Sequence, residues 1–139
     1  MQATENELNP YAASNFSMRI LLVKESTIDA ISLECILEDL GHRVVAVAVT
    51  LDQVDKILFE MAGAIDLVIF DALLSGMPSV ALSEKIADYN LPAIVQSIMT
   101  EEDIRALSFQ DEYLPQYCTD EDIHRMFCDM GLSITNRIA

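Results

Sequence analysis

The sequence predicts an α/β fold, a doubly wound sheet of five parallel strands with helices on both faces. Two observations predict it. From Met18 onward, short runs rich in Ile, Leu and Val alternate five times with longer segments that carry apolar residues at helical spacing. The short runs are apolar at most positions, which is typical of parallel strands buried on both faces. Strands that follow one another through helices form right-handed crossovers, and these distribute the helices over both faces of the sheet.

The predicted strands are Arg19–Val23, Arg43–Val49, Asp66–Asp71, Pro92–Gln96 and Glu112–Gln116. The first (RILLV) is a continuous apolar run, the second is rich in β-branched residues, and the third (DLVIFD) has an apolar centre. Proline has no backbone N–H for a hydrogen-bond ladder. Pro92 therefore fits the start of a strand, and Pro115 predicts that the last strand lies at an edge of the sheet.

Capping residues and helical spacing predict two helices in the first half of the chain. Thr27–Leu40 ends before Gly41, and its predicted inward face is Ile28, Ile31, Cys35, Ile36 and Leu40. Thr50 and Gln53 have the spacing of a capping box and precede a helix that Gly63 helps to end. The predicted inward face of this second helix is Leu51, Val54, Ile57, Leu58 and Met61.

The second half of the chain contains two further predicted helices. Ser79 is the expected cap of a helix that reaches Tyr89, with an inward face of Val80, Leu82, Ile86 and Ala87. Thr119 and Asp122 cap a last helix that ends at Gly131, with an inward face of Ile123, Met126, Phe127 and Met130. Between the fourth and fifth strands only Thr100–Leu107 has helical character, so this crossover helix is expected to be short or irregular.

The length of the chain indicates one domain, and its charge indicates that the domain does not bind polyanions. The chain of 139 residues divides into a predicted leader (1–17), a domain (18–132) and a tail (133–139). The net charge of −15 repels nucleic acid and anionic lipid, so we expect neither as a partner. The three cysteines show no disulfide or metal-ligand spacing. With no recognisable signal peptide or membrane-spanning run, the sequence predicts a cytoplasmic protein.

Charged residues follow two of the predicted strands. Lys24 and Glu25 follow the first strand, and Asp71 ends the third. If these strands are neighbours, the two carboxylates converge on one crevice at the carboxyl edge of the sheet, where ligands bind in such folds. Their repulsion can be relieved by a shared proton, by Mg²⁺ or by the ammonium of Lys24. Alternatively, both acids are ordinary solvated residues.

Enzymatic chemistry is not indicated. The four glycines are isolated, so no phosphate-binding loop is present. Neither His42 nor His124 has a serine or cysteine beside it in a nucleophile motif. The sequence therefore predicts a protein that is not an enzyme.

Several motifs together resemble the receiver domains of two-component response regulators. They are RILLVKE at 19–25, LEDLGH at 37–42, DLVIFD at 66–71 and Ser97 after the fourth strand. FDALLSGMPSVALSEKI followed by LPAIVQS is similar to stand-alone receivers whose fourth strand reads Pro-Phe-x-Phe-Ala-Thr-Gly. The resemblance covers about Met18 to Leu132 and implies the flavodoxin-like strand order 2-1-3-4-5.

The resemblance also implies roles for individual residues. Asp71 takes the position of the phosphoacceptor, and Ser97 that of the switch hydroxyl that bonds the phosphoryl group. Tyr113 takes the position of the switch aromatic residue. Glu25, Asp71 and the backbone carbonyl of Leu73 take the positions of the Mg²⁺ ligands.

Two departures from the family pattern concern charge. Lys24 replaces the first acid of the Mg²⁺-binding pair, and Gln116 replaces the phosphate-contacting lysine. We therefore expect weak Mg²⁺ binding and an ion pair between Lys24 and Asp71, with Lys24 taking over part of the role lost at Gln116. Ile98-Met99 and Leu74-Ser75 also depart from the family pattern around the site.

Two functions remain open. In the first, the chain is a stand-alone receiver in a phosphorelay, with a histidine kinase, a phosphotransferase or another signalling protein as partner and Asp71 as phosphoacceptor. In the second it is a pseudo-receiver, a protein-binding module that acts without phosphorylation. Asp71, Glu25 and Ser97 favour the first function, and Lys24 and Gln116 favour the second.

Overall fold

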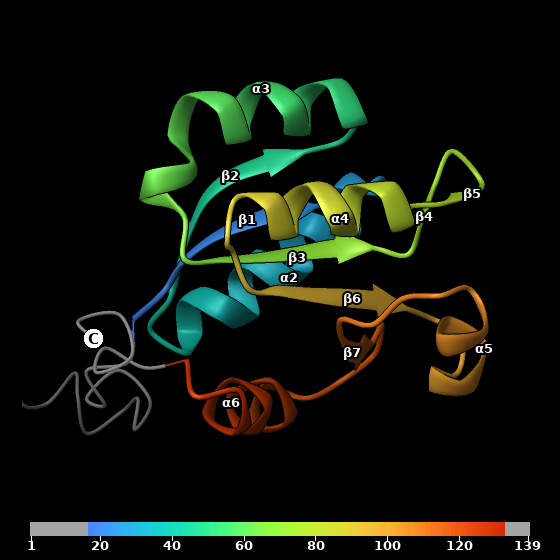
Figure 1. Ribbon diagram of the computed structural model, residues 1–139. Coiled ribbons are helices and arrows are strands. Elements are labelled where there is room, and N and C mark those ends of the chain that lie inside the picture. Colours follow the sequence, from blue (N-terminus) through green and yellow to red (C-terminus); the bar gives the residue numbers. More distant parts are fainter. Residues whose placement is uncertain (1–16, 133–139) are drawn as a thin grey trace, which may run out of the picture.

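Five parallel strands form the centre of the protein, in the order β2-β1-β3-β6-β7 (Figure 1). They are β1 (Arg19–Val23), β2 (Arg43–Ala48), β3 (Leu67–Asp71), β6 (Ala93–Ser97) and β7 (Glu112–Pro115). The structure is a computed structural model and describes residues 17–132, so the predicted tail and all of the predicted leader except Ser17 lie outside it. The order 2-1-3-4-5 is confirmed, and β7, which ends in Pro115, is an edge strand as expected.

Helices cover both faces of the sheet (Figure 1). One face is covered by α3 (Leu51–Met61), which a 3₁₀ turn η1 (Ala62–Ala64) follows, and by α4 (Val80–Asp88). The other is covered by α2 (Thr27–Asp39) and α6 (Asp120–Asp129). Each layer has its own apolar core: Val54, Leu58, Leu82 and Ile86 in the first, and Leu33, Leu37, Ile123 and Phe127 in the second. In residues 17–132 no helix has the length and apolar character needed to cross a bilayer.

The short helix α5 (Glu101–Ala106) confirms the expectation for the last crossover. Ile104 is fully buried and anchors it to the core. The Arg105 guanidinium donates hydrogen bonds to the carbonyls of Phe109 and Asp111, at 3.1 and 2.7 Å. These contacts fix the path from α5 into β7.

The inward face predicted for α2 is wrong at three of its five residues, whereas Leu40 is buried and Ile36 half-buried as expected. Ala30, Leu33 and Leu37 are buried, whereas Ile28 and Ile31 are 76% and 55% exposed and Cys35 is exposed. The helix carries apolar residues around most of its circumference, so their spacing does not select one face. On the other helices, Leu51 and Ala87 were assigned inward and are exposed.

Two of the predicted caps differ in detail. The Thr50 hydroxyl accepts from the backbone N–H of Gln53, but the Gln53 side chain accepts from Val49 instead of closing the box on Thr50. The Ser79 hydroxyl makes no capping bond and donates to backbone carbonyls of the preceding loop. At α6, the predicted capping box of Thr119 and Asp122 is present in both directions.

Between β3 and α4 lies a hairpin of two very short strands that was not predicted. It consists of β4 (Leu73–Leu74) and β5 (Met77–Pro78), which pair antiparallel. Ser75 and Gly76 form its turn with φ values of 53° and 75°, in the left-handed region. Strands of this length carry no periodicity that a sequence pattern can reveal.

A buried histidine lies between the start of β1 and α6. His42 is 4% exposed, its Nδ1 accepts from the backbone N–H of Met18 at 3.1 Å, and its ring packs edge-on against Phe127. Burial lowers the pKa of His42 from 6.5 to about 4, and the nearby charge of His124 contributes in the same direction. The folded protein therefore favours neutral His42.

We expect the free energy of unfolding to fall as the pH is lowered from 6.5 towards 4, because the unfolded chain takes up a proton that folded His42 does not. The contribution of His42 reaches about 3 kcal/mol at the lower end of this range. His42→Asn keeps an acceptor for Met18 and removes the titration. Urea denaturation across this range should give a smaller loss for the variant than for the wild type; equal losses would contradict the assignment.

Candidate functional site

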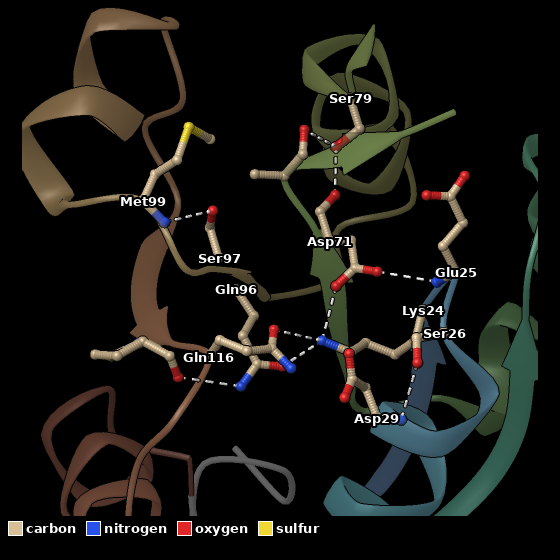
Figure 2. A network of polar contacts seen from close by, with 12 residues as sticks. Lys24, Glu25, Ser26, Asp29, Asp71, Ser79, Gln96, Ser97, Met99 and Gln116 are labelled. Atoms are coloured by element: carbon tan, nitrogen blue, oxygen red, sulfur yellow. Dashed lines mark hydrogen bonds and ion pairs between the residues drawn. The ribbon is translucent and has the colours of Figure 1, made fainter. Parts of the chain in front are cut away.

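Polar side chains from four strands meet at the carboxyl edge of the sheet (Figure 2). Lys24 directly follows β1, Asp71 ends β3, Gln96 lies near the end of β6 and Gln116 follows β7. β1 and β3 are adjacent, and Asp71 stands opposite Gln96 in the β3–β6 register. The fold therefore brings together residues that are up to 92 positions apart in the sequence.

The Lys24 ammonium is the centre of this cluster. Its Nζ lies 2.7 Å from Asp71 Oδ1, 2.6 Å from Gln96 Oε1 and 3.3 Å from Gln116 Oε1. An ammonium has three N–H donors, so these three acceptors account for all of them. The Lys24 side chain is 1% exposed and that of Asp71 is 19% exposed. The expected ion pair between Lys24 and Asp71 is thus present, and it is largely removed from water.

Glu25 contacts Asp71 through its backbone and not through its carboxylate. Its N–H donates to Asp71 Oδ2 at 2.9 Å. Its carboxylate accepts from the backbone N–H of Ser75 in the turn of the hairpin. Figure 2 shows the Glu25 side chain directed away from the Lys24 ammonium. The Glu25 carboxylate therefore binds the turn of a hairpin that was not predicted.

Ser97 and Tyr113, expected as switch residues, both bind the backbone of Met99. The Ser97 hydroxyl accepts from the Met99 N–H at 3.0 Å, and Figure 2 shows it directed towards that residue. The Tyr113 hydroxyl donates to the Met99 carbonyl at 2.5 Å. Burial, followed by the charge of Glu101, raises the pKa of Tyr113. The structure therefore brings these two residues together at the start of the β6–α5 connection.

Gln96 is the residue of the site that sequence reasoning missed. It is 2% exposed, accepts from Lys24 and donates through Nε2 to the Pro115 carbonyl at 3.2 Å. The signal in the sequence is a single long polar residue inside an otherwise apolar strand. A buried glutamine needs partners for its amide, and a buried ammonium on a neighbouring strand can supply one.

The side chains present do not fit a resident Mg²⁺ ion, which the family resemblance implies. Mg²⁺ prefers several oxygen ligands, including carboxylates. Of the three expected ligands, Asp71 faces an ammonium and the Glu25 carboxylate binds the hairpin turn. The third, the backbone carbonyl of Leu73, belongs to β4. Within residues 17–132 no group of three or more Asp, Glu, His or Cys side chains is arranged to hold a metal. The cation that compensates Asp71 is Lys24.

Comparison by sequence and by structure gives different results. Neither a protein-family model nor a curated protein matches the sequence. By structure, the chain is similar to the signal receiver domain of the putative response regulator NarL from Mycobacterium tuberculosis (TM-score 0.68, 18% identity, 82% of this chain and 95% of that one). It is also similar to a LuxR-family two-component response regulator from Aurantimonas sp. (TM-score 0.70, 17% identity, 82% and 84% covered).

A third similar structure contains BeF3 and Mg²⁺. It is the CheX-CheY-BeF3-Mg²⁺ complex from Borrelia burgdorferi (TM-score 0.66, 18% identity, 81% of this chain and 89% of that chain). All three similarities cover most of the described residues. The order of the five strands in the sheet is the one expected for receiver domains. At these identities they establish the fold.

Proposed function

We propose that this chain, which has the fold of response-regulator receiver domains, is a signalling module that binds a partner protein without being phosphorylated. The observation that carries the proposal is the Lys24 ammonium, buried and 2.7 Å from the carboxylate in the phosphoacceptor position. It gives Asp71 a permanent counter-charge supplied by the chain itself. The module acts in the cytoplasm, and its partners are signalling proteins.

The contacts of Lys24 argue against phosphoryl transfer to Asp71. Such a transfer requires positive charge on the oxygens of the phosphoryl group as it moves. The three donors of Lys24 are already occupied by Asp71, Gln96 and Gln116. Within the described residues, no three Asp, Glu, His or Cys side chains are grouped to hold a divalent cation. The occupied donors of Lys24 therefore support the proposal that Asp71 is not phosphorylated.

One observation favours the alternative, a phosphoaccepting receiver. The Asp71 side chain is 19% exposed at the end of β3, so a donor can reach it. In this alternative an Asp71 carboxylate oxygen attacks a phosphohistidine, the P–N bond breaks as the O–P bond forms, and the departing imidazole nitrogen takes a proton from solvent. Ser97 would then release Met99 to bond the phosphoryl group.

The test is incubation of the wild type with acetyl phosphate and Mg²⁺, followed by intact-protein mass spectrometry. We expect no phosphoryl adduct, whereas a stand-alone receiver of known activity, treated in parallel, should acquire one. Asp71→Asn identifies the site of any adduct. An adduct that forms on the wild type and is lost in this variant would establish the alternative function.

A further inference from the structure

A groove of about 330 Å³ lies between the start of α3 and the β4–β5 hairpin, beside the Lys24–Asp71 site. Its lining includes Val49, Leu51, Leu74 and Met77, with Asp52 at the rim. We call it the hairpin groove. Met77 and Leu51 are 67% and 51% exposed, and Val49 is 39% exposed. Three large apolar side chains that the protein leaves uncovered thus surround one hollow.

Hydrogen bonds hold the backbone on both sides of the hairpin groove. On one side, the Thr50 cap sets the first turn of α3, which carries Leu51. On the other side, the Glu25 carboxylate holds the N–H of Ser75 in the hairpin turn. A preformed apolar hollow loses little conformational entropy on binding, and a methionine at its rim adapts to the shape of an inserted side chain.

The negative charge of the protein around the hairpin groove indicates which kind of segment binds there. The rim carries Asp52, the neighbouring Glu25 is exposed, and the residues that line the groove include no lysine or arginine. The whole chain has a net charge of −15, so a second copy of it is repelled. A cationic segment of another protein is attracted to this surface instead.

We propose that the hairpin groove binds an apolar side chain from a segment of a partner protein that is rich in lysine or arginine. The proposal deepens the function proposed above and rests on it, since it names the surface and the chemistry of the partner. Glu25 joins the groove to the site, because its backbone N–H binds Asp71 while its carboxylate positions the hairpin. A basic residue that flanks the inserted side chain meets the acids Glu25 and Asp52.

The test uses two labelled peptides and fluorescence anisotropy. The first peptide has a central pair of leucines flanked by arginines and serines, and the second has glutamates in place of the arginines. The variant Leu51→Ser/Met77→Ser removes the exposed apolar walls. The matched control Phe59→Ser/Ile98→Ser removes side chains that are 84% and 79% exposed and do not line the groove.

We expect the wild type and the control variant to bind the cationic peptide with equal affinity and the Leu51→Ser/Met77→Ser variant to bind it at least about tenfold more weakly. Binding should weaken with added salt. The proposal is overturned if the cationic peptide does not bind, if the acidic peptide binds as tightly, or if the two double variants behave alike. It is also overturned if sedimentation shows a wild-type dimer that Leu51→Ser/Met77→Ser dissociates, because a second copy is then the occupant. Phosphorylation of Asp71 would overturn the proposed function, but it would not change the peptide binding measured here.

Discussion

Lys24→Met is expected to lower the free energy of unfolding by about 3 kcal/mol, which is the cost typical of breaking a buried ion pair by removing one partner. Methionine fills a similar volume, so the loss arises from charge and hydrogen bonds. Without the ammonium, Asp71 loses its ion pair, and the amide oxygens of Gln96 and Gln116 lose their donor. Urea denaturation near neutral pH measures the difference.

The chain offers a matched control in the ion pair of Lys85 with Asp55. Both side chains are about half exposed, at 44% and 49%, so Lys85→Met should cost less than about 1 kcal/mol. Asp71→Asn in the Lys24→Met background should recover part of the stability, because the uncompensated charge is then absent. If Lys24→Met costs no more than Lys85→Met, the buried pair does not have the structural role assigned to it.

The double variant Lys24→Asp/Gln116→Lys should convert the site into one that binds Mg²⁺ and accepts a phosphoryl group. Aspartate at position 24 replaces a positive charge with a negative one beside Asp71, which favours a divalent cation. Lysine at position 116 returns a cation to the end of β7. We expect Mg²⁺ affinity to rise by at least about tenfold over the wild type, in calorimetry or NMR titrations.

Single variants separate the two changes. Lys24→Asp alone should tighten Mg²⁺ binding, whereas Gln116→Lys alone adds a second positive charge and should not. With acetyl phosphate, only the double variant should acquire a phosphoryl adduct on Asp71. Wild-type protein that binds Mg²⁺ as tightly as Lys24→Asp would show that Lys24 does not exclude the metal.

The arrangement of the sheet could be predicted because its signals are strong and local. Strands such as RILLV are apolar at most positions, and each is separated from the next by a helix. The face of α2 could not be predicted, since Ile28 and Leu33 are equally apolar and the neighbouring elements decide which is buried. Helical spacing identifies a helix reliably, but it selects a face only when the opposite face is polar.

The candidate site was predictable to the extent that it depends on strand ends. Lys24 follows β1 and Asp71 ends the neighbouring β3, so the expected strand order together with their opposite charges indicated the pairing. The contact of Gln96 with Lys24 depends on the register of β6 against β3, which no local pattern encodes. The direction of the Glu25 carboxylate depends on a turn with two residues of positive φ, and its position is set by tertiary contacts.

The Lys24 ammonium differs from a metal ion in being covalently attached to the chain. Its effective concentration at Asp71 is set by the fold and not by the surroundings, so chelators and changes in cellular cation levels leave it in place. When a phosphoryl group or a metal ion activates a signalling protein, the active state lasts until the phosphoryl group is hydrolysed or the metal ion dissociates. A cation that is part of the chain is neither hydrolysed nor released, so it sets no such time limit. If the chain is the binding module proposed above, the duration of its signal is therefore set by how fast the cell makes and degrades it, and by how long each partner stays bound.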